Sequence, residues 1–117
     1  MGERIFCFGS NRAGIHGAGA AKHARLHHSA QWGVGEGRTG WAYAIPTKDH
    51  AIRTLPLEQI RPGVERFLDY AREHPELTFE VTAIGTGLAG YKPHQIAPMF
   101  AGAPSNCELP EGWRDHG

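Results

Sequence analysis

The sequence predicts a single α/β domain built around a largely parallel sheet. Strand-like and helix-like segments alternate along its 117 residues, and two of the strand-like segments break directly into glycine-rich loops. A chain of this length can bury one modest hydrophobic core and not two. Alternation of strands and helices is typical of parallel sheets, because each crossover helix returns the chain to the same end of the sheet. We therefore expect one domain over residues 1–117.

Composition limits the classes of function. Apolar residues make up 40% of the chain and charged residues 21%, as in soluble globular proteins. No apolar run approaches the length of a membrane span, and the first residues show no signal-peptide pattern. We therefore expect a cytoplasmic protein without a membrane partner. The formal net charge is zero, which argues against a general nucleic-acid binder. Residues 1–57 hold seven Lys/Arg and three Asp/Glu (+4), and residues 58–117 hold five and nine (−4), so the first half suits an anionic ligand.

The cysteines and histidines predict neither a disulfide nor a metal site. Cys7 lies in the first apolar run and is interpreted as a small buried hydrophobic residue, and a disulfide with Cys107 is disfavoured in a cytoplasmic chain. His23 and His27 are four residues apart on a predicted helix. No third ligand accompanies them, so we interpret them as part of a solvated helix face. We expect no metal and no cofactor.

The first predicted elements are a strand, a loop and a helix. Arg4–Phe8 is short and apolar, with β-branched and aromatic residues, which indicates a buried strand ended by Gly9. Residues 9–15 hold several turn formers and predict a loop. The alanine-rich sequence that follows predicts a helix from Gly17 or Ala18 to about Ser29.

A second strand is predicted over Trp41–Ile45. Residues 31–40 before it contain four glycines and are expected to form a surface loop or lid. Pro46 is expected to end the strand, because proline cannot donate to the hydrogen-bond ladder of a sheet. Thr47 and Lys48 then fall just beyond its carboxyl end.

The clearest helix pattern lies in the middle of the chain. Apolar residues recur four, seven, eight and eleven positions after Ile60, which is one face of a helix. Because Pro62 is tolerated only in the first turn, we expect the regular helix to begin near Arg61 and to end at His74 and Pro75. The stripe consists of Ile60, Val64, Phe67, Leu68 and Ala71.

The last third of the chain predicts one strand, a loop and two short elements. Thr78–Ile84 has the composition of a strand and runs into the second glycine loop, Gly85–Gly90. A short or irregular helix is expected around His94–Phe100, because Pro98 interrupts it. An edge strand is expected around Cys107–Leu109.

The glycine loops are predicted to share one edge of the sheet. In parallel α/β sheets, ligands bind beyond the carboxyl ends of the strands. Residues 9–19 follow the first predicted strand, residues 47–49 the second and residues 85–90 the third. A glycine loop before a helix holds phosphate well, since the backbone can come close and the first helical N–H groups point at the anion. We therefore predict that two glycine loops clamp one phosphate-bearing ligand, although neither loop matches a Walker or dinucleotide fingerprint.

Three short blocks stand out: Asn11 with residues 16–21 (HGAGAA), residues 44–48 (AIPTK) and residues 84–90 (IGTGLAG). They resemble the blocks of macrodomains, the α/β/α modules that bind ADP-ribose and related nucleotides. Their order and spacing are similar to those of small macrodomains that hydrolyse ADP-ribose from glutamate or DNA bases. The resemblance covers residues 6–100 and implies a three-layer α/β/α sandwich around a mixed, mostly parallel sheet.

The resemblance also implies roles for these blocks. Residues 17–21 would lie against the pyrophosphate and the distal ribose, and the backbone N–H groups of residues 85–90 would wrap the diphosphate from the other side. Lys48 matches a lysine that serves as a catalytic residue in the hydrolase subgroup. The predicted ligand contacts are Ser10, Asn11, His16, Gly17, Ala18, Gly19, Ala20, Thr47, Gly85, Thr86, Gly87, Leu88, Ala89, Gly90 and Tyr91.

Three of these residues have alternative interpretations. Asn11 either binds a ribose or forms an Asx-turn. His16 either touches phosphate or is a plain loop residue. Tyr91, directly after the second loop, is the preferred residue for stacking on a base.

Departures from the family pattern favour capture of the ligand over its cleavage. In one branch of the subgroup an aspartate follows the GxGL motif, and here that position is Ala89, so an attacking Lys48 lacks an acid–base partner. The acidic residue that often grips adenine in macrodomains has no clear counterpart. We therefore predict binding, and sequestration, of ADP-ribose or a related cyclic or signalling nucleotide by a phage or bacterial protein, for instance in a virus that opposes a bacterial host. The alternatives are an ADP-ribosyl hydrolase using Lys48 and a non-catalytic structural or interaction module; the oligomeric state is left open.

Overall fold

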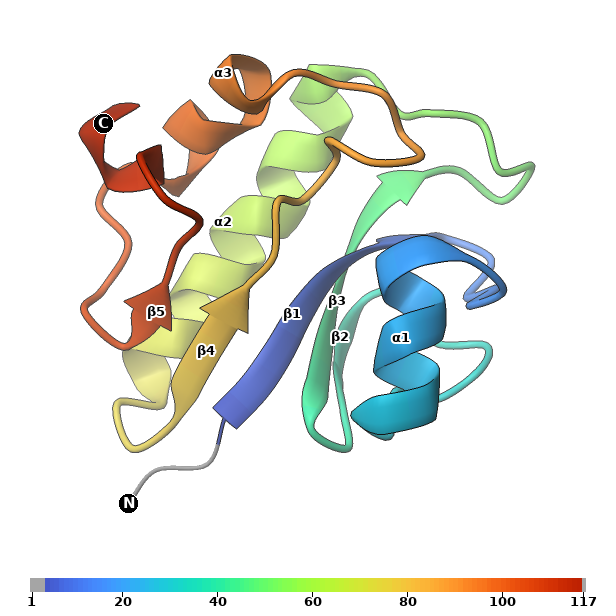
Figure 1. Ribbon diagram of the computed structural model, residues 1–117, viewed down its shortest axis with the longest axis horizontal. Helices are drawn as coiled ribbons and strands as arrows, with labels where there is room; N and C mark the ends of the chain where they lie inside the picture. Colours follow the sequence, from blue (N-terminus) through green and yellow to red (C-terminus); the bar gives the residue numbers. More distant parts are fainter. Residues whose placement is uncertain (1–3, 117) are drawn as a thin grey trace.

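The computed structural model describes residues 4–116 and contains a five-stranded sheet with helices on both faces (Figure 1). The strand order is β2-β3-β1-β4-β5, so the first strand lies in the centre. Within the described residues, no helix combines the length and apolar character needed to cross a membrane. The strands are β1 (Arg4–Asn11), β2 (Gly37–Thr39), β3 (Ala42–Lys48), β4 (Thr78–Val81) and β5 (Cys107–Glu108), and the helices are α1 (Gly19–His27), α2 (Leu57–Glu73) and α3 (Pro93–Ile96), with 3₁₀ turns over Ala97–Phe100 and Trp113–His116.

The sheet is mixed, with one antiparallel strand at an edge. β1 pairs in parallel with both β3 and β4, and β4 pairs in parallel with β5. β2 pairs antiparallel with β3 and lies inside residues 31–40, so the prediction of a plain loop there is wrong. A three-residue strand with a glycine at its start carries too little β-branched or apolar sequence to be recognised by its pattern.

Two strands are longer than the sequence suggests, and Pro46 is the informative case. β3 runs through Pro46 to Lys48, so the prediction that proline ends the strand is wrong. β2 pairs with β3 only as far as Ala44. Pro46 therefore lies past the end of β2, so β2 has no carbonyl there that would need an N–H donor from residue 46. β1 likewise extends beyond Phe8 to Asn11, with Gly9 paired to Ile45.

Helix boundaries differ from the expectations at prolines and turns. α2 begins at Leu57, four residues before the predicted start, with Pro62 inside it. Pro62 is exposed, so the hydrogen bond that its missing N–H cannot make is lost on the solvent side of the helix.

β4 ends at Val81, earlier than predicted, because residues 82–86 turn, with hydrogen bonds from Ile84 N to Thr82 O and from Thr86 N to Ala83 O. The helix around Pro98 is irregular, as expected, and continues α3 as a 3₁₀ turn.

Alternate side chains of β1 serve two hydrophobic cores of unequal size. Ile5 and Cys7 face α2 and join the larger core, which includes Phe67, Phe79 and Phe100. Phe6 and Phe8 face α1, and apart from these two phenylalanines the smaller core consists of five alanines. The two cysteines are both free and buried, and burial raises their thiol pKa values.

Candidate functional site

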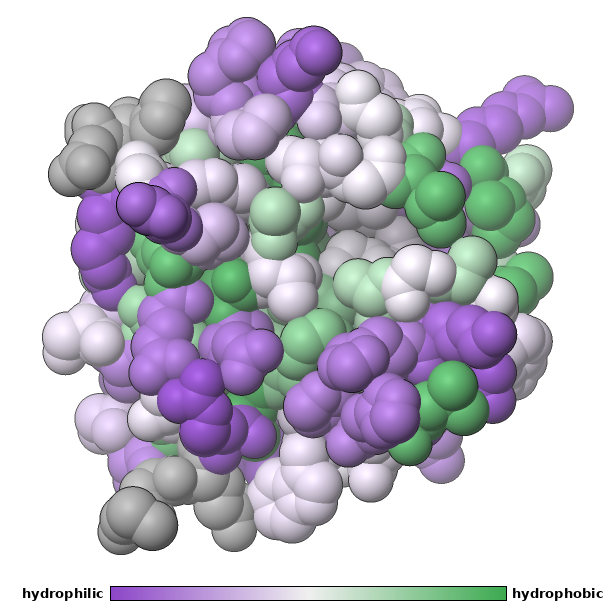
Figure 2. Space-filling view, in the orientation of Figure 1, coloured by the Kyte–Doolittle hydropathy of each residue, from purple (hydrophilic) through white to green (hydrophobic). Residues whose placement is uncertain are grey.

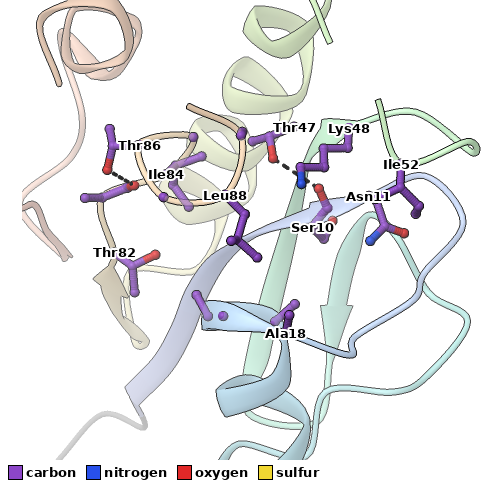
Figure 3. Close-up of a pocket in the computed structure, with 18 of the residues that line it drawn as sticks. Ser10, Asn11, Ala18, Thr47, Lys48, Ile52, Thr82, Ile84, Thr86 and Leu88 are labelled. Atoms are coloured by element: carbon purple, nitrogen blue, oxygen red, sulfur yellow. Dashed lines mark hydrogen bonds between the residues drawn. The ribbon is translucent and has the colours of Figure 1, made fainter. Parts of the chain in front are cut away.

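A cavity of about 630 Å³ lies at the carboxyl ends of the parallel strands (Figure 3). The three loops that the sequence placed at this edge do meet there, together with the start of α1. Figure 2 shows apolar side chains gathered on the side of this face where the loops after β3 and β4 lie. The lining comprises Gly9, Ser10, Asn11, Ile15, residues 17–21, Thr47, Lys48, Ile52 and residues 82–89.

The N-terminus of α1 opens into this cavity without a cap. Ala18 is the N-cap residue and offers no side-chain hydrogen bond, and the first turn holds no acidic residue. The helical ladder starts with Lys22 N donating to Ala18 O at 3.1 Å. Among the described residues, the N–H groups of Gly19, Ala20 and Ala21 have no partner. These groups and the positive end of the helix dipole form a ready site for an anion.

The loop over Gly85–Gly90 presents a second set of donors. Its shape is fixed by hydrogen bonds from Gly90 N to Gly87 O at 3.0 Å and from Tyr91 N to Gly85 O at 2.9 Å. Thr54 Oγ1 donates to Ala89 O at 3.0 Å and ties the loop to the segment after β3. Over the described part of the chain, the N–H groups of residues 87, 88 and 89 have no acceptor. Three consecutive free N–H groups in a turn are typical of an anion-binding concavity.

The two sets of donors lie close enough to act on one ligand. A Cβ built on Gly9 would be 3.6 Å from Gly85 N, and one built on Gly19 would be 3.3 Å from Leu88 Cδ1. Gly19 has φ +58, a conformation that favours glycine. Figure 3 shows Leu88 reaching from its loop toward Ala18 at the start of α1. The side chain of Leu88 is 68% exposed and therefore sits over the cavity rather than in a core.

Asn11 and Ser10 line the cavity, but their polar side-chain atoms hold the first loop. Asn11 Nδ2 donates to Ile15 O at 2.8 Å, and Asn11 Oδ1 accepts from Ile15 N at 2.9 Å. Ser10 Oγ donates to Gly35 O, and Thr47 Oγ1 donates to Ser10 O at 3.2 Å. The Asn11 geometry matches the loop-forming alternative, since both ends of its amide are engaged within the chain.

Among the described residues, Lys48 is the only charged side chain in the lining. It ends β3, is half-buried, and its backbone is held by an antiparallel bridge to Thr54. The neighbouring Asp49 does not line the cavity. The Asp49 carboxylate accepts hydrogen bonds from Arg53 N at 2.9 Å and Ala51 N at 2.8 Å, which hold its pKa below the usual value. Within residues 4–116, the lining therefore contains a single cation and no carboxylate, imidazole or thiol.

Three predicted contacts lie outside the lining. The His16 ring is fully buried against Phe8, at 5.4 Å between ring centroids, and neither ring nitrogen has a hydrogen-bond partner among the described residues. Burial lowers the pKa of His16, so the ring is neutral at pH 7. Tyr91 packs against the larger core, its hydroxyl donates to Leu55 O, and it does not line the cavity. Gly90 also lies outside the lining.

Two exposed isoleucines of the lining were not anticipated. Ile15 is 43% exposed and Ile52 is 41% exposed, and with Leu88 they give the cavity an apolar mouth. Ile52 has φ +63, a strained conformation for a β-branched residue and one that clusters at ligand-binding sites. No sequence signal marks Ile52, because the turn that strains it is set by the two backbone N–H groups bound to Asp49. Such a mouth suits the rings of a nucleoside.

No protein-family model, curated protein or solved structure matches this chain. Two sets of free backbone donors, one lysine and an apolar mouth can bind a ligand that carries both phosphate and an apolar ring.

Proposed function

We propose that the cavity captures a diphosphate-bearing nucleotide, ADP-ribose or a related cyclic or signalling nucleotide. One observation carries the proposal: among the described residues, the unpaired N–H groups at the start of α1 and over residues 87–89 belong to residues that line the same cavity. A diphosphate has enough acceptor oxygens to engage both sets, and hydrogen bonds to a charged group are the strong ones. Lys48 adds a positive side chain to the lining.

The proposal includes a finer description of the fold, a macrodomain-like three-layer α/β/α sandwich. Helices on both faces of a mixed sheet support it, as does the position of the cavity at the carboxyl ends of β1, β3 and β4. The apolar mouth formed by Ile15, Ile52 and Leu88 supports a nucleoside rather than a bare polyphosphate.

Capture is favoured over cleavage because the lining lacks an acid–base partner. General acid–base catalysis needs a titratable group within hydrogen-bond reach of the reacting atoms. Asp49, the carboxylate nearest to Lys48 in sequence, is engaged by two backbone N–H groups. A hydrolase using Lys48 alone would have no group here to receive its proton or activate water.

Titration calorimetry with ADP-ribose, cyclic ADP-ribose, ADP and ribose 5-phosphate tests the proposal. We expect the nucleoside diphosphates to bind and ribose 5-phosphate to bind far more weakly, because it cannot reach both donor sets. Absence of binding to all four at millimolar ligand would contradict capture and favour an inert module. Chromatography of the same samples after incubation should recover each ligand intact. Separate incubations with ADP-ribosylated protein and DNA test the hydrolase alternative: release that disappears in Lys48→Ala would establish it.

A further inference from the structure

Three histidines gather at the end of α1 that lies away from the cavity. His23 is on α1 and His28 is its C-cap residue, and their Nε2 atoms are 3.3 Å apart. The ring of His27 lies 4.7 Å from that of His23, between centroids. None of the three lines the cavity. Figure 2 shows the side of α1 toward the viewer as mostly hydrophilic, interrupted by an apolar side chain. The cluster therefore has no part in the nucleotide site.

The paired rings of His23 and His28 rest on a buried platform. The ring of His28 stacks on Phe6 at 4.3 Å with an interplanar angle of 5°, and the ring of His23 lies 5.1 Å from Phe6. Phe6 is 7% exposed and belongs to the smaller core. The backbone of His28 is fixed as well, since its N–H donates to Ala24 O and its carbonyl accepts from Trp41 N. Both rings are thus positioned by packing before any ligand arrives.

The separation of the two nitrogens matches the bite of a metal chelate. Imidazole nitrogens bind Zn²⁺ at about 2.0–2.1 Å, so two of them at a tetrahedral angle lie about 3.3–3.4 Å apart. We propose that His23 and His28 chelate a divalent transition-metal ion, Zn²⁺, Ni²⁺ or Cu²⁺, through their Nε2 atoms. Imidazole suits these three metals, whereas Mg²⁺ and Ca²⁺ require oxygen ligands.

One carboxylate lies on the strand next to Phe6. Glu80 lies on β4 opposite Phe6 and is itself held by Arg4 at 3.0 Å. Among the described residues, no group of three or more His, Cys, Asp or Glu is arranged to hold a metal. Water therefore fills the remaining positions of the ion, which makes this an open site.

Zinc titration of the full chain, followed by calorimetry and by the ¹⁵N signals of the imidazoles, tests this inference. We expect one equivalent of Zn²⁺ to bind and to shift the Nε2 signals of His23 and His28. His23→Gln and His28→Gln should each weaken zinc binding about tenfold or more. His94→Gln is the matched control, because His94 is exposed on α3 and should leave zinc affinity unchanged.

Several outcomes would overturn the assignment. The first is that neither Nε2 signal shifts at millimolar Zn²⁺. The second is that the His23→Gln, His28→Gln double variant binds Zn²⁺ as tightly as wild type. The third is that the control variant loses as much zinc affinity as the His23 and His28 variants. Melting in EDTA shows whether each variant is folded, and wild type should melt higher with zinc than with EDTA. ADP-ribose binding measured in EDTA should be unaffected, so failure of the metal site and failure of the nucleotide site are separable.

Discussion

Gly87→Val separates ligand binding from folding more cleanly than any other substitution in the cavity. Gly87 is exposed, lines the cavity and has an ordinary backbone conformation, and a Cβ there meets no protein atom within 4 Å. Valine can therefore be built without a clash. Its side chain would occupy the space beside the free N–H groups of residues 87–89, where we place the diphosphate.

The two expected effects of Gly87→Val differ in size. An exposed substitution of this kind changes the free energy of unfolding by about 0.5 kcal/mol or less. A hydrogen bond to a charged group contributes about 1.5–3 kcal/mol, so losing a single N–H contact weakens binding about 10- to 150-fold. Displacement of the whole diphosphate would weaken it further.

Titration calorimetry with ADP-ribose and thermal melting without ligand measure these two effects. Gly17→Val should behave in the same way from the other side of the cavity, since a Cβ there meets only Ile15 Cγ2 at 4.0 Å. Ala101→Val is the control, because Ala101 is exposed outside the cavity with φ −57 and ψ 134, which valine tolerates. If Gly87→Val binds ADP-ribose as tightly as wild type does, the ligand does not contact this loop and the clamp is refuted.

Three further predictions follow from single residues. Lys48→Met should weaken ADP-ribose binding about tenfold at low salt and less at high salt, since salt screens exposed charges; calorimetry at two salt concentrations checks this, and a salt-independent loss would argue against a phosphate contact. Asn11→Ala removes both hydrogen bonds to Ile15 and should lower the free energy of unfolding by about 1–3 kcal/mol, which an unchanged urea midpoint would contradict. Burial lowers the pKa of His16 from 6.5, so the unfolded chain binds more protons at acid pH. The contribution of neutral His16 to the free energy of unfolding should therefore be fully present above pH 6.5 and should decline as pH falls toward the lower pKa of the folded state. His16→Leu should flatten the plot of unfolding free energy against pH in this range. An equal slope in wild type and variant would show that His16 does not cause the pH dependence.

The placement of the loops was predictable because it follows from topology. Once parallel strands alternate with helices, the carboxyl ends of β1, β3 and β4 must share an edge, so loops after them converge. The buried face of α2 could also be predicted, since the spacing of its apolar residues alone places them on one side of the helix.

Features set by tertiary contacts were not predictable. Pro46 continues a strand because β2 happens to stop at Ala44, which no local pattern reveals. The His16 ring turns into the protein because Phe8 and Trp32 flank it. His28 joins His23 because the chain ends its helix over Phe6, a spacing of five that helical periodicity does not highlight.

The small side chains packed beneath α1 have a consequence for the proposed nucleotide site. Among the described residues, the hydrophobic cluster beneath α1 contains Phe6, Phe8 and five alanines, which bury less apolar surface than the large side chains packed against α2, so we expect α1 to detach locally at a lower free-energy cost than α2. In the proposed function the N-terminus of α1 supplies half of the anion donors, so we expect only the fraction of molecules with α1 docked to bind the ligand at full strength. Amide hydrogen exchange in α1 should therefore report directly on occupancy. A larger side chain that fits beneath the helix would raise affinity from a distance, without touching the ligand at all.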